Sequence, residues 1–175
     1  MSGGWTAVMR IMGDIFSMTG NRATQIETLQ QTAAALAQLT VNATDTALDY
    51  RSAPDEWTIR EILAHLVDDE MYVMRTRMER IIKEDHPHLA PHDEKAWYAQ
   101  RNTARDALAE LLADFATQRA ASLGIITMLR ESDWLREGFQ PEIGTFTAEG
   151  WLTHWAEHDT VHLRQIERAL AAQVG

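Results

Sequence analysis

The sequence contains no cysteine, and this absence removes several classes of protein at once. A disulfide-stabilised scaffold, a cysteine nucleophile and a thiolate metal site all require that side chain. Any metal ion must therefore bind through the 7 histidines and the 26 aspartate and glutamate residues. Because proteins of reducing compartments lack disulfides, we expect a cytoplasmic location.

Positive charge and long apolar runs are also scarce. Lysine occurs only at Lys83 and Lys95, and the formal net charge of the 175-residue chain is −10. Nucleic-acid binding depends on clustered Lys and Arg that neutralise phosphates, so we expect no nucleic-acid partner. No apolar run approaches the ~18–20 residues of a membrane span, and the first residues do not resemble a secretory signal. We therefore expect no membrane partner.

Proline and glycine are few, at 4 and 9 residues, and helical patterns fill most of the chain. Capping signals and apolar spacing predict four helices, over about 24–40, 58–83, 103–129 and 147–172. Residues 131–146 are expected to form an irregular connection with a short hairpin. The fold class is therefore all-α, a four-helix bundle over residues 21–175. Residues 1–20 form an N-terminal extension with apolar residues at the spacing of a short extra helix.

Two histidines of the last predicted helix indicate a metal site. On a helical wheel His158 and His162 fall inside or beside the apolar arc that contains Trp151 and Trp155. Imidazoles four residues apart on one helix can bind the same metal ion. His154 lies further from the centre of this arc, where we expect it to support the site or line its pocket. The pair His154 and His158 is the alternative ligand set.

The second predicted helix offers the third ligand. His65 shares one edge of this helix with Asp69 and Tyr72, beside the apolar stripe. A polar strip next to a buried face is typical of a cavity wall, so we expect Asp69 to orient an imidazole or act as a catalytic base. Tyr72 and Trp155 are expected to line the pocket, and His92 to reach it from a proline-containing loop.

A bundle without metal is the alternative interpretation of these histidines. Buried imidazoles are often satisfied by hydrogen bonds alone, although burying two of them without a shared partner costs several kcal/mol. Other known architectures do not match the sequence. The Glu-x-x-His pair of di-iron bundles, the His-Glu-x-x-His of metalloproteases and the Gly-x-Ser-x-Gly of serine hydrolases are all missing.

Four segments, which together reach across residues 24–172, resemble the DinB-like superfamily of bacterial helical bundles and its YfiT-like branch. They are Trp57-Thr-Ile-Arg-Glu-Ile-Leu-Ala-His65-Leu-Val-Asp68, Pro91-His92-Asp93-Glu94-Lys-Ala-Trp97, Pro141-Glu142-Ile-Gly144 and His158-Asp-Thr-Val-His162-Leu-Arg-Gln165-Ile166. The chain departs from the branch at His92, where tyrosine is usual, and at Gln140, where histidine is frequent. We expect these two departures to affect the substrate rather than the metal.

The resemblance implies an up-down-down-up bundle with one divalent metal ion on His65, His158 and His162. Nickel or zinc is the ion expected, with iron or manganese as alternatives, and the family implies a homodimer. Many members of known function use a low-molecular-weight thiol such as bacillithiol or mycothiol. We therefore expect a metal-dependent S-transferase that joins a small thiol to an electrophile. A metal-dependent hydrolase and a non-catalytic metal-binding stress-response bundle are the alternatives.

Overall fold

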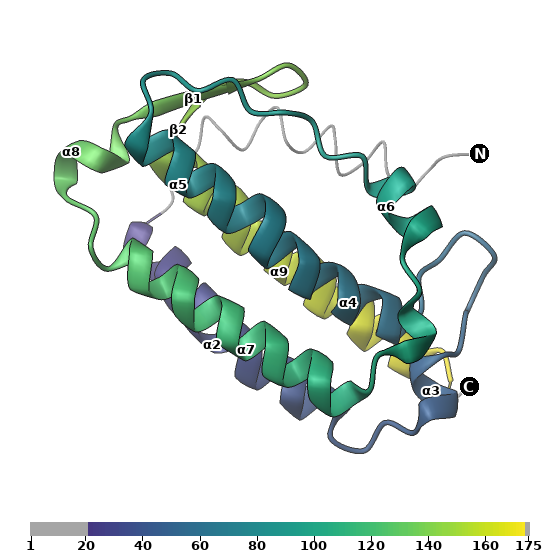
Figure 1. Ribbon diagram of the computed structural model, residues 1–175. Helices are drawn as coiled ribbons and strands as arrows, with labels where there is room; N and C mark the ends of the chain where they lie inside the picture. Colours follow the sequence, from purple (N-terminus) through teal and green to yellow (C-terminus); the bar gives the residue numbers. More distant parts are fainter. Residues whose placement is uncertain (1–20, 174–175) are drawn as a thin grey trace.

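The chain forms a bundle of four long helical segments in the computed structural model, which describes residues 21–173 (Figure 1). The predicted extension over residues 1–20 lies outside the described residues. The long segments are α2 (Arg22–Thr40), α4 with η1 and α5 (Ile59–Asp69, Glu70–Met74 and Arg75–Lys83), α7 (Leu108–Ile126) and α9 (Ala148–Ala171). The short elements are α3 (Asp45–Leu48), α6 (Glu94–Gln100), η2 (Thr103–Arg105), α8 (Glu131–Trp134), β1 (Glu137–Gln140) and β2 (Gly144–Thr147). The predicted all-α class and four-helix bundle are confirmed.

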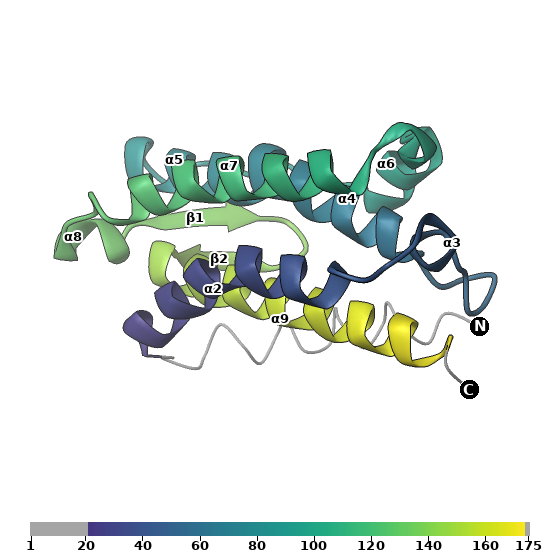
Figure 2. The ribbon, with the colours of Figure 1, turned by 90° about the horizontal axis from the view of Figure 1, so that it is seen from below.

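The direction of the helices follows the up-down-down-up order. α2 and α9 run one way, while α4 with α5 and α7 run the other way (Figure 1). Seen from below, α2 and α9 form one layer and α4, α5 and α7 form the other (Figure 2). α2 packs against α9 and α7, and α4 packs against the same two helices. The parallel pair α5 and α7 therefore needs a long crossover, residues 84–107, which returns along the bundle and carries α6.

Capping explains where three of the helices begin. Thr58 and Glu61 form the predicted capping box of α4, and the predicted cap Thr147 accepts from the Gly150 amide at the start of α9. The box predicted at Thr24 is wrong. The Asn21 side chain accepts from the Ala23 amide, so α2 already begins at Arg22. Asparagine is the better N-cap residue, and it comes first along the chain.

The third helix begins later than the sequence predicts. Thr103–Arg105 form the separate 3₁₀ turn η2, capped by the Asn102 side chain, and α7 begins only at Leu108. The predicted hairpin is present, with β1 and β2 paired antiparallel and Glu137 opposite Thr147. At four residues each, these strands are too short for an alternating pattern to reveal them. No helix within residues 21–173 has both the length and the apolar character needed to cross a membrane.

A π-helical turn interrupts the second long segment at η1. Such turns add a residue to the helix and occur frequently at functional sites. Here the turn begins between two buried carboxylates with different partners. Asp69 contacts His65 and His158, whereas Glu70 binds Arg119 in the centre of the bundle.

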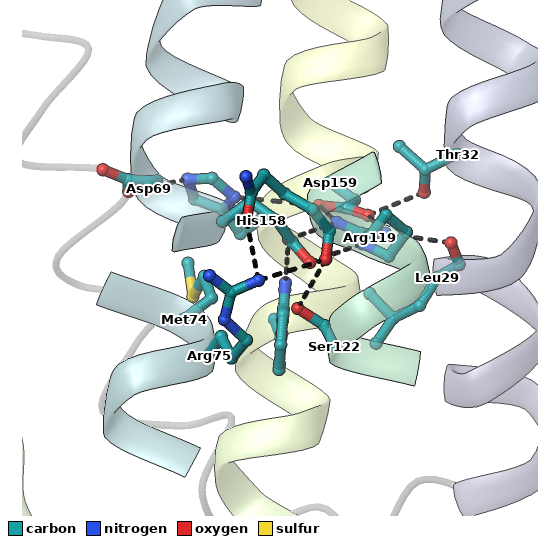
Figure 3. Close-up of polar contacts among 12 residues, drawn as sticks. Leu29, Thr32, Asp69, Met74, Arg75, Arg119, Ser122, His158 and Asp159 are labelled. Carbon is teal, nitrogen blue, oxygen red and sulfur yellow. Dashed lines mark hydrogen bonds and ion pairs between the residues drawn. The ribbon is translucent and has the colours of Figure 1, made fainter. Parts of the chain in front are cut away.

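The core consists of two apolar clusters with a charged layer between them. One cluster surrounds Trp151 and Trp155 and the other surrounds Phe115 and Ile166. Each long segment contributes one polar side chain to the layer, and these four are Thr32, Glu70, Arg119 and Asp159. The layer therefore joins all four segments (Figure 3).

Arg119 holds this layer together. Its guanidinium donates to both Glu70 oxygens, at 2.9 and 2.8 Å, and to both oxygens of Asp159. The Thr32 hydroxyl donates to Asp159 at 2.6 Å, and the Trp155 indole donates to Glu70 at 2.9 Å. Burying charges is costly unless they are paired and fully hydrogen-bonded, and this arrangement meets that condition.

Arg119→Met should lower the free energy of unfolding by about 3–5 kcal/mol, because it leaves two buried carboxylates without their cation. Arg80→Met is the matched control. It removes a solvent-exposed pair with Glu84 and should cost less than about 1 kcal/mol. Chemical denaturation followed by circular dichroism measures both values. Equal losses in the two variants would show that the layer contributes no more than a surface pair.

Candidate metal centre

Three imidazoles converge between α4 and α9. The Nε2 atom of His158 lies 3.2 Å from Nε2 of His65 and 3.2 Å from Nε2 of His162. His65 is 1% exposed and His162 is 8% exposed, and one nitrogen from each of the three rings lies within 4.8 Å of the others. The structure thus brings together the three predicted ligands, from two antiparallel helices.

The hydrogen-bonding of the rings suits a cation. Gln165 Oε1 lies 2.7 Å from Nδ1 of His162 and can only accept, so that nitrogen carries the proton and the neutral ring directs an Nε2 lone pair into the cluster. In its ring plane, the Nε2 of His158 offers either one hydrogen or one lone pair, although it faces two ring nitrogens at 3.2 Å each. At most one of these two contacts can therefore be a well-aligned hydrogen bond. A divalent ion between the three nitrogens would accept a lone pair from each, so the residues fit a metal ion.

Asp69 and His92 border the cluster on the side of the crossover. One oxygen of Asp69, Oδ2, lies 3.6 Å from Nε2 of His65 and 3.5 Å from Nε2 of His158. The other oxygen, Oδ1, lies 3.3 Å from Nε2 of His92. Burial acts to raise the pKa of Asp69, but His65, His158 and His92 hold it well below its usual range. The carboxylate is therefore anionic at neutral pH.

The three imidazoles differ in their affinity for protons. Burial lowers the pKa of His65 to about 4. Burial, together with His158 and His65, also lowers the pKa of His162 well below its ordinary value. Burial acts in the same direction on His158, but Asp159 and Asp69 outweigh it and raise the pKa to about 9. Without a metal ion, the cluster therefore carries one positive charge near pH 7, on the doubly protonated ring of His158.

The charged layer touches the cluster through His158. Its Nδ1 lies 3.9 Å from Oδ1 of Asp159, whose carboxylate is held by Arg119 (Figure 3). Carboxylates behind a ligand imidazole fix its orientation and increase its basicity. The sequence analysis missed Asp159, Arg119 and Gln165 as supporting residues. A charged residue directly after a histidine on the inward arc was the available signal for Asp159.

Glu94 is a further carboxylate that the sequence analysis did not single out. It is half-buried at the start of α6, and together with His65 and Asp69 it forms a second group whose ligand atoms lie within 4.8 Å of one another. Burial, and then the charge of Asp69, raise the pKa of Glu94 to about 7. His92 lies two residues before Glu94 in the same crossover segment. The crossover therefore places two titratable side chains beside the metal centre.

The other predicted residues take different positions. His154 packs with its ring 6.4 Å from that of His158 and 4.9 Å from that of Trp151. Trp155 lies in the core, where its indole donates to Glu70. Tyr72 is 66% exposed and does not reach the cluster. It lines a small pocket of about 180 Å³ whose other lining residues are Val73, Arg77, Arg80, Leu89, Ala90, Pro91 and His92. His92 thus connects this pocket to Asp69.

The segments that form this cluster lie within a region that matches a known protein family. The model of the DinB superfamily matches residues 28–166, which include all three histidines and Asp69. The chain belongs to the DinB superfamily.

A relative that is similar in both sequence and structure agrees with this membership. The protein named "Putative metal-dependent hydrolase YfiT" of Bacillus subtilis (strain 168) is 24% identical over 151 residues, which cover 83% of each chain. The solved structure of YfiT, described as "a probable metal-dependent hydrolase with an unusual four-helix bundle topology", covers 85% of each chain at 24% identity, with a TM-score of 0.78. The structural likeness establishes the shared fold.

The metal-free protein should lose stability as the pH rises from about 6.5 to about 9. The folded-state pKa of His158 is raised, so its contribution is fully present below the ordinary value of 6.5 and lost as pH rises through about 9. The lowered pKa values of His65 and His162 affect stability only below pH 6.5. Denaturant titrations at several pH values measure the trend.

His158→Gln is the control for this prediction. It should leave only the smaller part of the trend, which is due to His92, whose pKa Asp69 also raises, and to Glu94, whose raised pKa of about 7 lies in the same range. Loading with a divalent ion should remove most of the trend, because the ion replaces the proton. An unchanged slope in His158→Gln would contradict the assignment of the proton.

Proposed function

We propose that this protein is a metal-dependent enzyme with one divalent ion on His65, His158 and His162. The observation that carries the proposal is the convergence of three buried ring nitrogens, two pairs of them only 3.2 Å apart. Three imidazoles without a fourth histidine or a cysteine are typical of catalytic rather than structural sites, because they leave coordination positions open. The name of the Bacillus subtilis relative as a metal-dependent hydrolase supports the same general activity.

Nickel or zinc is the ion that we propose, with iron or manganese as alternatives. Imidazole nitrogen suits zinc, nickel and iron, and cysteine is not available to favour a softer ion. When bound, such an ion lowers the pKa of a coordinated water or thiol and so supplies a nucleophile near pH 7. The family resemblance also predicts a homodimer, which size-exclusion chromatography with light scattering can test.

The protein's own groups prepare the site for this chemistry. The neutral rings of His65 and His162 offer lone pairs, and the Asp159 carboxylate lies 3.9 Å behind Nδ1 of His158 and makes that ring more basic. The half-buried indoles of Trp57 and Trp97 pack on His65, which is itself buried from bulk water. Asp69 provides negative charge beside the ligands, and we propose a catalytic role for it. The pocket at Tyr72 and His92 provides a place for a small substrate next to the centre.

Transfer of a small thiol to an electrophile is the reaction that we propose first. The chain has no cysteine, so the sulfur nucleophile must come from a cosubstrate. A bond forms between the thiolate sulfur and the electrophilic carbon, and the bond from that carbon to its leaving group breaks. The thiol proton passes to solvent or to a nearby carboxylate. Hydrolysis is the second candidate, favoured by the printed name of YfiT, with water in place of the thiol.

Protein purified without chelator should contain about one divalent ion per chain, measured by inductively coupled plasma mass spectrometry. His65→Ala and His162→Ala should reduce this stoichiometry to near zero, because two imidazoles bind far more weakly than three. His86→Ala is the matched control, since His86 is exposed and distant from the cluster, and it should retain the full ion content. A wild-type stoichiometry near zero after incubation with nickel or zinc would refute the metal centre.

The metal-loaded protein should consume a small thiol in the presence of a generic electrophile, followed by loss of free thiol. Chelation, or His158→Ala, should reduce the rate at least ~100-fold, because the nucleophile is then no longer activated. A parallel assay with ester and amide substrates tests hydrolysis. Turnover confined to the hydrolytic substrates would replace the transferase proposal, and turnover that survives His158→Ala would reject both reactions at this centre.

A further inference from the structure

Asp69 is a buried anion without a cationic protein side chain of fixed charge. Its side chain is 4% exposed, and its ion-pair contacts are to His65, His92 and His158. Among the side chains that the structure describes, no arginine or lysine nitrogen lies within 4.0 Å of it. Glu70, the next residue, shows the contrast, because Arg119 binds both of its oxygens. A buried carboxylate needs a counter-charge, and the side chains in contact with Asp69 are imidazoles, which are not permanently charged.

The position of Asp69 also matches that of a ligand. Four donors around a metal at the usual zinc distances of about 2.0–2.1 Å are separated from one another by roughly 3.3–3.5 Å in a tetrahedral arrangement. Oδ2 of Asp69 lies 3.6 and 3.5 Å from the Nε2 atoms of His65 and His158. These separations resemble the 3.2 Å between His158 and each of the other two imidazoles. The carboxylate oxygen thus lies at ligand spacing from two of the three nitrogens.

We propose that Oδ2 of Asp69 is a fourth ligand of the metal ion and that His92 positions the carboxylate through Oδ1. This inference rests on the proposed metal centre and assigns Asp69 to the ion itself rather than to the transfer of a proton. Nε2 of His92 lies 3.3 Å from Oδ1, at ion-pair distance but outside hydrogen-bond geometry, so the two oxygens of Asp69 face different groups. Ligating carboxylates are commonly held in this way by a second group.

His92 is the group beside the second oxygen of Asp69, and a neutral phenol at that place could not supply a positive charge near pH 7. Asp69 as a ligand reduces the net charge of the centre from +2 to +1. A centre of lower charge attracts an anionic nucleophile less strongly, and it still retains room for one more ligand by expansion to five-coordination.

Measured metal affinity distinguishes a role of Asp69 as a metal ligand from a role as a catalytic base. Zinc is titrated into the full-length protein in competition with a chromophoric chelator, for the wild type and four variants. Asp69→Ala and the isosteric Asp69→Asn should each weaken zinc binding at least ~100-fold, and His92→Phe should weaken it ~10–100-fold. Glu94→Gln tests the competing assignment of the carboxylate ligand. It neutralises a neighbouring carboxylate of the same region and should change the affinity less than ~3-fold.

Cobalt(II) provides a second measurement that does not depend on activity. The visible ligand-field bands of the cobalt-loaded wild type should shift in Asp69→Asn and Asp69→Ala, and stay in place in Glu94→Gln. Circular dichroism of each metal-free variant establishes whether it is folded. If Asp69→Ala does not fold, the conservative variant Asp69→Asn provides the test.

The outcomes distinguish failure of this inference from failure of the metal centre. Absence of zinc binding in the wild type would reject the proposed function as a whole. Wild-type affinity and spectra in both Asp69 variants, with turnover lost, would overturn the fourth ligand and establish Asp69 as a base. A large loss of affinity in Glu94→Gln with none in the Asp69 variants would assign the carboxylate ligand to Glu94 instead.

Discussion

The ion-pair layer around Arg119 is the constraint on which the rest of the structure depends. One guanidinium binds carboxylates from two segments, and the Thr32 hydroxyl binds one of those carboxylates from a third, so all four segments of the bundle meet at one level. A layer of this kind admits only one register between the helices, since a shift of a single residue would leave a buried charge unpaired. The same register fixes where His65 and His158 face each other. The relative positions of the histidines therefore depend on charged side chains that lie outside the set of metal ligands.

Helix boundaries and inward faces were the most predictable features of this chain. The capping box at Thr58 and the cap at Thr147 are local signals, because they involve side chains and amides within three residues of each other. The inward direction of His158 and His162 follows from helical periodicity alone. The start of α7 was predicted too early, since an isolated 3₁₀ turn carries the same local pattern as the first turn of a longer helix.

The groups that surround the histidines could not be predicted, because they depend on contacts between distant segments. In the sequence, Arg119 looks like an ordinary polar residue of an amphipathic helix. Its partners Glu70 and Asp159 are 49 and 40 residues away along the chain. Glu94 and His92 reach the centre only because the crossover returns along α4. The π turn at η1 was equally hidden, since nothing in the composition of Glu70–Met74 separates it from a regular helix. Tyr72 shared a helix edge with His65 in the sequence, but in the structure it lies within this turn and is exposed at the surface.

The long crossover between α5 and α7 and the long helices have different roles at the centre. Two helices that run in the same direction cannot be joined by a tight turn, so this topology always includes a connection that travels the length of the bundle (Figure 1). In this protein that connection forms one wall of the centre, while the imidazoles stand on helices anchored in the core. Substitutions or insertions in residues 84–107 can therefore reshape what enters the centre at little cost to the packing. Diversification of substrates among related bundles would then proceed by exchange of this one segment around an unchanged set of histidines.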